Sequence, residues 1–171
     1  EQENKLKSEG MTSEEITFQK KNYYILDVQR HFLENSFDFT LETIGIFENN
    51  DIVKKACIVL QNKMVQFIQS LDSDTIPINR SENTVENSFD VILENEDYTI
   101  GKTIELILYE KYYILDKELS FCGFKKLHPH NNDSFIRISF NENKDKIRVK
   151  EILRSACLDA RELFNKIREL F

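Results

Sequence analysis

Apolar and polar residues alternate in two closely similar octapeptides, NSFDFTLE at residues 35–42 and NSFDVILE at residues 87–94. Six of the eight positions match across an offset of 52 residues. In each copy one apolar face repeats every second residue, which is typical of a half-buried β-strand. The pattern therefore predicts one strand at Phe37–Leu41 and a second at Phe89–Leu93.

Helical periods of three and four residues follow each of these strands. They predict an amphipathic helix over 51–71, a short helix over 100–112 and a long helix over 149–171. Two further strands are predicted at 119–125 and 135–140. The polar stretch 72–86, which contains Pro77, is interpreted as a linker, and residues 1 to about 21 are expected to be loosely structured.

The order of elements indicates two related units, since each octapeptide leads through Thr-Ile-Gly into a helix. The alternative is chance, because strands share a biased composition. The predicted class is α+β. The predicted divisions are an N-terminal segment 1–34, a first unit 35–71, a linker 72–86 and a second unit 87–171.

Charge and composition narrow the possible functions. The chain of 171 residues carries a formal charge of −7, and 40% of its residues are hydrophobic. Strong binding to nucleic acid is disfavoured, because it calls for a dense basic face. No run approaches the roughly 20 apolar residues of a membrane span, and the polar N-terminus does not resemble a signal peptide. Because the first residue is Glu1, we expect a fragment or a processed product.

The cysteine and histidine residues are the candidate chemical groups. Three widely spaced Cys suit a reducing compartment better than a disulfide framework. Cys122, His128 and His130 are three possible zinc ligands, but no fourth ligand is spaced to close a site. A Cys122–histidine nucleophile pair is a further alternative, although packing explains this Cys better. The residues 141–152 begin like a calcium loop and lack its Gly and its final Glu. We expect no catalytic group, no metal and no cofactor.

The second unit resembles a specific family. Residues 94–101 (ENEDYTIG) are similar to the E-x-E-D-H-T-L-G stretch of the small α-like subunit of RNA polymerases, the eleventh subunit of RNA polymerase II or archaeal L. Residues 120–129 (SFCGFKKLHP) resemble that family's F-A-G-Y-K-x-x-H-P stretch. Tyr98, Lys102 and Cys122 stand where His, Asn and Ala are usual. The matching positions are Glu94, Glu96, Asp97, Thr99, Gly101, Phe121, Gly123, Phe124, Lys125, His128 and Pro129.

The first unit resembles the C-terminal end of the larger α-like subunit, the third subunit of RNA polymerase II or archaeal D. That subunit has a strand ending in E-S-x-G before a helix starting E-x-I-V, and residues 37–45 and 51–63 are similar to these two elements. The joint resemblance implies a fusion of two α-like dimerisation units, as in large cytoplasmic DNA viruses of the asfarvirus kind. It also implies an antiparallel sheet packed on helices.

The resemblance implies a non-catalytic assembly platform of a DNA-directed RNA polymerase. Its implied partners are the remaining N-terminal part of the larger α-like unit, the second-largest polymerase subunit and small zinc-binding subunits, with no direct nucleic acid and no membrane. The implied location is host cytoplasm and virion for a viral protein, or the nucleus for a cellular one. The alternative is a free-standing acidic dimerisation module. The residues expected to form the dimer interface are Ile52, Ala56, Leu60, Phe67, Ile104, Leu108, Leu153, Ala156, Ala160, Leu163, Phe164 and Ile167.

Overall fold

The structure is a computed structural model that describes residues 6, 8, 10–81 and 86–171. The chain forms two compact units, residues 1–41 and residues 42–171. The division falls close to residue 41 and not within the stretch 72–86. The helix predicted at 51–71 therefore folds with the second compact unit.

The first unit contains helix α2 (Ser13–Asn22), followed by the π-helical turn Tyr23–Asp27 and the 3₁₀ turn Val28–Arg30. The expectation of loose structure up to residue 21 is wrong for α2. Thr12 and Glu15 form a reciprocal capping box at its start: the Glu15 N–H donates to Thr12 Oγ1, and the Thr12 N–H donates to the Glu15 carboxylate at 2.8 Å. These bonds satisfy backbone donors that a helix N-terminus leaves free.

The predicted strand at residues 37–41 is not formed in this structure. Phe37 and Phe39 are 73% and 90% exposed. A strand needs a neighbour for its backbone hydrogen bonds, and the ladders of the described residues lie among β1 to β4 alone. The alternating pattern therefore gives this segment the composition of a strand, but none of the described strands pairs with it.

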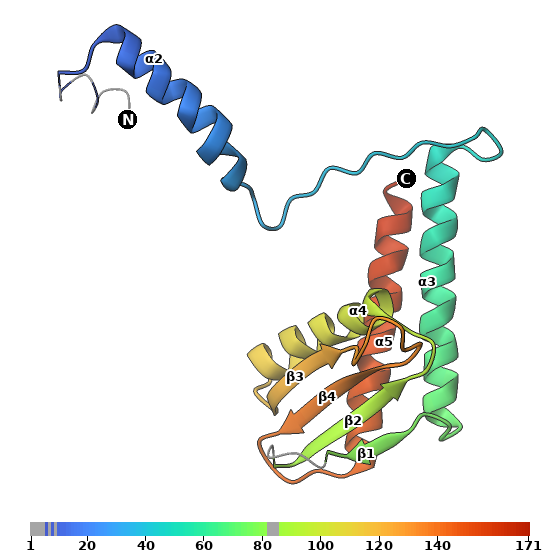
Figure 1. The fold of residues 1–171 in the computed structure, drawn as a ribbon. Helices are drawn as coiled ribbons and strands as arrows, with labels where there is room; N and C mark the ends of the chain where they lie inside the picture. Colours follow the sequence, from blue (N-terminus) through green and yellow to red (C-terminus); the bar gives the residue numbers. More distant parts are fainter. Residues whose placement is uncertain (1–5, 7, 9, 82–85) are drawn as a thin grey trace. The chain divides into compact units, whose positions relative to one another are not determined.

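The second unit is a four-stranded antiparallel sheet covered by helices (Figure 1). Its strand order is β1-β2-β4-β3, with Ile78 opposite Val91 in the first ladder and Val91 opposite Ile136 in the second. The elements are α3 (Asn49–Asp72), β1 (Ile78–Arg80), β2 (Ser88–Leu93), α4 (Tyr98–Leu108), a π-helical segment (Tyr109–Leu115), β3 (Leu119–Lys125), β4 (Ser134–Phe140) and α5 (Lys146–Glu169).

The α+β class and most predicted elements are confirmed. Two details differ. The stretch predicted as a linker contains β1, where Ile78 is buried and the Pro77 carbonyl accepts a hydrogen bond from the Ile92 N–H at 3.0 Å. The short helix ends as an α-helix at Leu108 and continues as π-helix to Leu115.

The core lies between the sheet and the helices α4 and α5. Strand residues that alternate along β2 and β4 point into it, among them Val91 and Ile136, which are fully buried. Ile152 and Ala156 of α5 are also fully buried. Period two on the strands and period 3.6 on the helix thus place their apolar faces on one shared core.

Helices α3 and α5, each of 24 residues, run antiparallel along one another (Figure 1). Asp72 at the end of α3 pairs with Arg154, while Gln61 donates to the Arg161 carbonyl at 3.4 Å. The sheet lies beside only part of this pair, and the beginning of α3 and the end of α5 extend beyond it. No helix among the described residues is long and apolar enough to cross a membrane.

Candidate protein interface

The motif residues 94–99 form a connection that joins three elements. Asp97 caps α4, because its carboxylate accepts a hydrogen bond from the Thr99 N–H at 3.2 Å. The Glu96 carboxylate pairs with Lys63 of α3 at 2.7 Å, and its carbonyl accepts a bond from Ser134 of β4 at 2.7 Å. The acidic motif therefore fixes the start of α4 against both the helix pair and the sheet.

Glu94 lies at the edge of this connection. With Lys63 and Phe67 it lines a hollow of about 270 Å³ between α3 and the end of β2. Phe67 is half-buried and packs against the core. The hollow lies where the outer surface of α3 meets the end of β2.

The two motif glycines are sites of close approach. A Cβ atom on Gly101 would overlap the Phe124 ring and lie 2.9 Å from its Cζ. A Cβ atom on Gly123 would lie 2.7 Å from Cζ of Phe121. Gly101 thus lets α4 approach β3 over the ring of Phe124, which also meets the Tyr98 ring edge-on at 5.2 Å between centroids. The family resemblance at these positions reflects packing and not chemistry.

The remaining motif residues, Lys125, His128 and Pro129, are exposed at the end of β3 and in the loop that follows it. The His128 and His130 rings lie 5.0 Å apart, and the His130 N–H donates to His128 Nδ1 at 3.2 Å. Among the residues that the structure describes, no three His, Cys, Asp or Glu side chains gather as metal ligands.

Cys122 does not have the surroundings of a nucleophile. It lies on β3, and its thiol donates weakly to the Glu105 carbonyl at 3.9 Å. Burial raises the pKa of this thiol to about 12, with the Glu105 carboxylate adding to the effect. A thiol with this pKa stays protonated at neutral pH, so packing explains Cys122 better than catalysis does.

The residues expected at a dimer interface fall into two groups, and their role there stays a prediction. Six lie within the core of this chain, namely Ile104, Leu108, Leu153, Ala156, Ala160 and Phe164. The others line the helix pair: Ile52, Leu60, Phe67 and Ile167 are half-buried, while Ala56 and Leu163 are exposed. Only the residues of the second group have side-chain surface left that a partner protein could contact.

Apolar side chains remain exposed where the helix pair extends beyond the sheet. Leu163 of α5 is 42% exposed, and Leu170, the residue that caps the end of this helix, is 82% exposed. Val59 of α3 is 55% exposed. Val59 was missed by the sequence reasoning. It continues the spacing of Ile52 and Ala56 at three and seven residues, which is the signal that could have found it. We call Val59, Leu163 and Leu170, with the half-buried Ile52 and Ile167, the arm surface.

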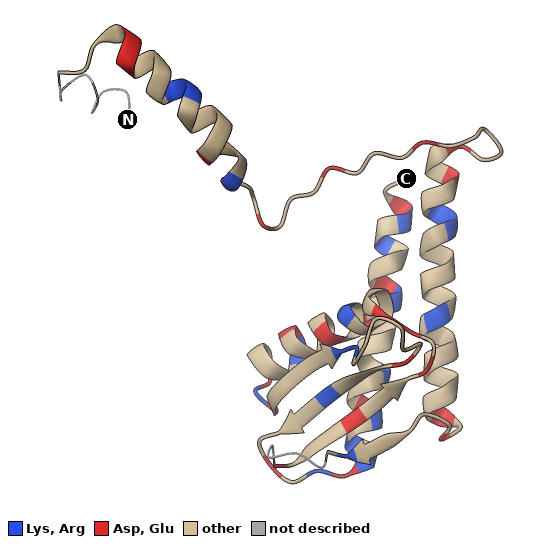
Figure 2. Cartoon of the chain, viewed as in Figure 1, with Lys and Arg blue, Asp and Glu red and all other residues tan. Residues whose placement is uncertain are grey.

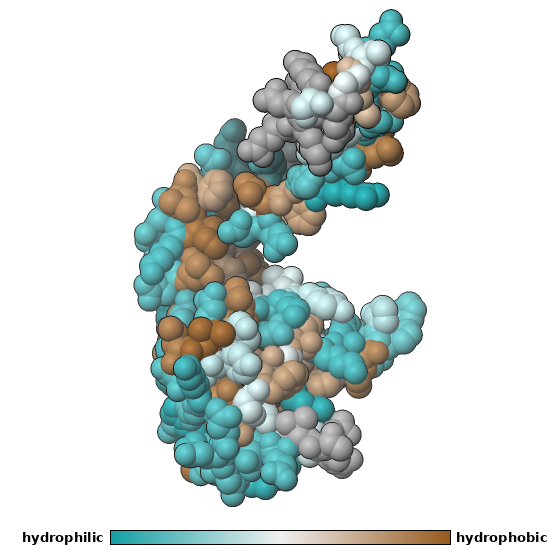
Figure 3. Space-filling view, turned by 90° about the vertical axis from the view of Figure 1, so that its left-hand side faces the viewer, coloured by the Kyte–Doolittle hydropathy of each residue, from teal (hydrophilic) through white to brown (hydrophobic). Residues whose placement is uncertain are grey.

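Charges of both signs are interspersed along α3 and α5 (Figure 2). On the face shown in Figure 3, apolar residues gather in patches between hydrophilic ones. Surfaces of this kind suit protein partners better than a polyanion, which would require a basic stripe.

Part of this chain is similar to a known family of protein domains. Residues 88–170 match the model of the RNA polymerase Rpb3/Rpb11 dimerisation domain. A comparison with curated proteins gave no match. The matched range runs from β2 to the end of α5 and includes both motif stretches. Residues 88–170, which include three of the four strands and the long terminal helix, are therefore similar to this dimerisation domain.

Proposed function

We propose that the chain is a non-catalytic assembly platform in which parts of two α-like units are fused. In this proposal α3 comes from the larger unit, and residues 87–171 form the smaller one. The two units pair through α3 and α5, and the pair holds the second-largest polymerase subunit. The match over residues 88–170 supports the smaller unit directly.

The proposal is supported mainly by the helix pair α3 and α5, of which the sheet covers only one part. Two helices of 24 residues run antiparallel, the sheet lies beside one part of them, and the arm surface exposes Leu163, Leu170 and Val59 on the other. Burying a Leu or Val fully stabilises a protein by about 1.5–3 kcal/mol. A second sheet packed on this surface would cover α3 in the way that the first sheet covers α5.

The repeated octapeptide indicates where such a sheet begins. In β2, the apolar residues Phe89, Val91 and Leu93 are buried in the core. Their counterparts Phe37, Phe39 and Leu41 are all exposed. We infer that residues 35–42 form a strand within the sheet of a larger α-like unit, and that the other strands of that unit are the nearest partner of this chain.

The wider assignments follow from the same proposal. Partners would include the second-largest subunit and small zinc-binding subunits, while the platform itself would make no direct contact with nucleic acid. A fusion of this kind suggests a large cytoplasmic DNA virus, with host cytoplasm and virion as its location. A cellular source would place the protein in the nucleus.

The test is affinity purification of the tagged protein from its source cells or virions, with mass spectrometry of what is recovered. We expect both large polymerase subunits to be recovered. Leu163→Asp combined with Leu170→Asp should reduce their recovery at least about tenfold, since both side chains are exposed here and would be buried in the complex. Leu158→Asp, at an exposed site on another face of α5, is the matched control.

The variants must first show wild-type circular dichroism and thermal unfolding. If the double variant recovers both large subunits at the wild-type level, the arm surface does not take part in the assembly. Recovery of small unrelated proteins alone by the wild type would favour the free-standing dimerisation module.

A further inference from the structure

Two ion pairs join α3 to the smaller unit, one in the second half of the helix and one at its end. Lys63 Nζ donates to both carboxylate oxygens of Glu96, at 2.7 and 2.8 Å. Asp72, the last residue of α3, pairs with Arg154 of α5. In the proposed function α3 belongs to the larger unit, so both pairs connect one unit to the other. Along α3 the positive charge comes first and the negative charge second, and the smaller unit supplies the opposite charges.

A third ion pair lies just beyond the end of α3. Asp74 pairs with Lys150 of α5 at 2.7 Å, and the hydrogen bond from Lys150 lowers the pKa of the Asp74 carboxyl. The backbone of Asp74 has a φ of 60°, which Asp tolerates better than most residues. The acidic end of α3 therefore faces two basic side chains of α5.

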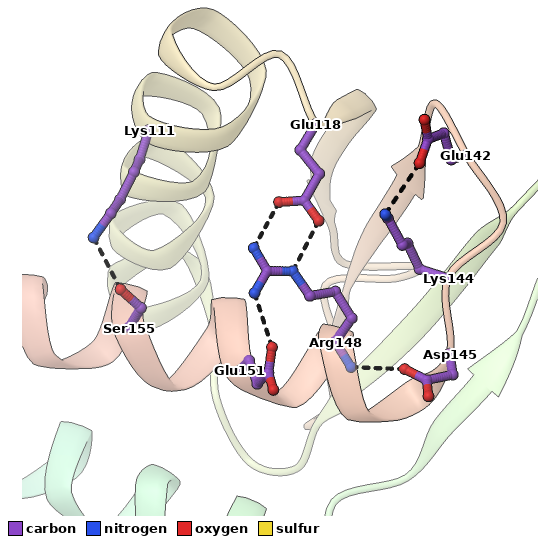
Figure 4. Close-up of polar contacts among 8 residues, drawn as sticks. All are labelled: Lys111, Glu118, Glu142, Lys144, Asp145, Arg148, Glu151 and Ser155. Carbon is purple, nitrogen blue, oxygen red and sulfur yellow. Dashed lines mark hydrogen bonds and ion pairs between the residues drawn. The ribbon is translucent and has the colours of Figure 1, made fainter.

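Other polar contacts of α5 stay within the smaller unit, as Figure 4 shows. Arg148 forms a two-pronged ion pair with Glu118 at 2.8 and 2.7 Å. Lys111 donates a hydrogen bond to Ser155 at 2.9 Å. These contacts hold α5 on its own sheet, and they would remain whichever helix lay beside α5. They therefore make no choice between partners, whereas the ion pairs with α3 do.

Helices α3 and α5 occupy corresponding places in the two units. Each has 24 residues, so Asn49 and Lys146 can be aligned as their first residues. This alignment places Phe67, which packs against the core, on Phe164, which is buried in it. Three further apolar residues of α3 fall on buried residues of α5, namely Ile52 on Val149, Ala56 on Leu153 and Leu60 on Cys157.

The same alignment shows a face on which the two helices differ. The residues of α3 that are buried in this chain are Cys57, Met64, Ile68 and Leu71. Their counterparts in α5 are Arg154, Arg161, Asn165 and Arg168. On this face α3 is therefore apolar where α5 is basic or polar, and neither helix can take the place of the other without a change in its surroundings.

Pairing of two smaller units would lose several of these contacts. With a second α5 in the place of α3, Arg161 would stand at the position of Met64, which is fully buried. Ala160 would stand at the position of Lys63 and would leave Glu96 without its partner. Burying a charge without a partner is strongly unfavourable. A twofold axis would repeat both losses in the second half of the dimer.

Pairing of two α3 helices is disfavoured by the same comparison. Val53 and Cys57 of a second α3 would stand where Lys150 and Arg154 stand in α5. The acidic end of α3 would then have no basic partner at these positions. Loss of matching contacts in a wrong pair is one of the ways in which proteins discriminate between partners.

We propose that these cross-unit contacts select the partner of α3, so that α3 pairs with the smaller unit and neither unit pairs with a copy of itself. The inference rests on the assignment of α3 to the larger unit in the proposed function. One exposed ion pair changes an equilibrium constant by up to about fivefold. Several pairs that favour the same partner multiply their effects, as charged positions do in the pairing of coiled coils.

The experiment compares two variants of the full chain, each with one side of two ion pairs reversed. The larger-unit variant carries Lys63→Glu and Asp72→Lys. The smaller-unit variant carries Glu96→Lys and Arg154→Glu. Each exchanges one positive charge for a negative one and the reverse, so the formal charge of both variants stays at −7. Asp74 is left unchanged because of its backbone conformation.

Within either variant both ion pairs are mismatched, whereas α3 of one variant matches the smaller unit of the other. Co-expressed with different tags, the two variants should exchange their α3 helices, with residues 73–77 as the hinge. We expect each variant to capture the other at least about tenfold above capture of wild type by wild type or of either variant by itself. Glu162→Lys with Lys166→Glu reverses an ion pair within α5 and is the control, which neither variant should capture above the wild-type level.

Urea unfolding gives a second measurement that does not depend on exchange. Each variant should unfold at a lower urea concentration than wild type, and a chain with all four substitutions, in which the pairs match again, should return to the wild-type midpoint. Capture between the variants at the wild-type level, or a four-substitution chain no more stable than either variant, would overturn partner selection. Neither measurement involves another polymerase subunit, so this inference and the platform can fail separately.

Discussion

Replacing Gly101 by Ala should destabilise the protein even though Ala favours helices. The new Cβ would overlap the Phe124 ring at the crossing of α4 and β3. Overfilling a packed site costs about 1–3 kcal/mol, and the deep overlap here favours the upper end. Ala gains about 1 kcal/mol over Gly in a helix. The expected net loss is therefore about 2 kcal/mol, measured by urea unfolding followed by circular dichroism.

The decisive control removes the obstacle. In a Phe124→Ala background the added methyl group has space, so Gly101→Ala should become stabilising by about 1 kcal/mol. The difference between the two backgrounds gives a coupling energy of about 3 kcal/mol, well above the additivity error of about 0.5 kcal/mol for independent sites. A coupling energy below that error, or an Ala variant as stable as wild type, would refute the steric reading of this motif glycine.

Three further predictions concern local bonds and thiols. Asp97→Ala should cost about 1 kcal/mol in unfolding free energy by removing the α4 cap, whereas Asp97→Asn should retain most of it. The hydrogen bonds from Arg148 lower the pKa of the Glu118 carboxyl. That pair therefore stabilises the fold above the ordinary carboxyl pKa and loses its effect as the pH falls, so Arg148→Met should flatten the stability decline between about pH 5 and pH 3. Burial raises the pKa values of Cys122 and Cys157 to about 12, so iodoacetamide at pH 8 should label both far faster in urea than in the native chain, as peptide mass spectrometry would show.

Each of these predictions has a clear contrary result. Equal unfolding free energies for Asp97→Ala and Asp97→Asn would show that the cap contributes little. If the unfolding free energy of the Arg148→Met variant depends on pH as that of the wild type does, Glu118 does not contribute to the loss of stability in acid. Rapid labelling of Cys122 in the native chain would show that β3 opens readily or that its thiol is less shielded than its burial indicates.

The sequence predicted the elements whose patterns are long. The period of α5 extends over more than six turns, so its apolar face is evident from the spacing of its residues alone. Helix α2 was missed because its apolar positions are few, although Thr12 and Glu15 supply the capping signal that announces it. Strand β1 was missed because three residues behind a proline carry no period.

The site was predictable in its residues but not in its contacts. Resemblance selected Gly101 and Phe124, yet nothing in a pattern shows that two residues 23 positions apart meet across α4 and β3. The ion pair of Lys63 with Glu96 likewise joins residues 33 positions apart.

The two octapeptides separate local preference from context. Six identical positions give residues 35–42 and 87–94 nearly the same intrinsic tendency to extend. Only the second copy becomes a strand, because β1 and β4 lie on its two sides and the core receives Phe89, Val91 and Leu93. The first copy holds the same apolar face exposed to solvent. What it lacks is therefore a neighbouring sheet and not a strand sequence. In the assembly that we propose, the sheet of the larger α-like unit would be that neighbour.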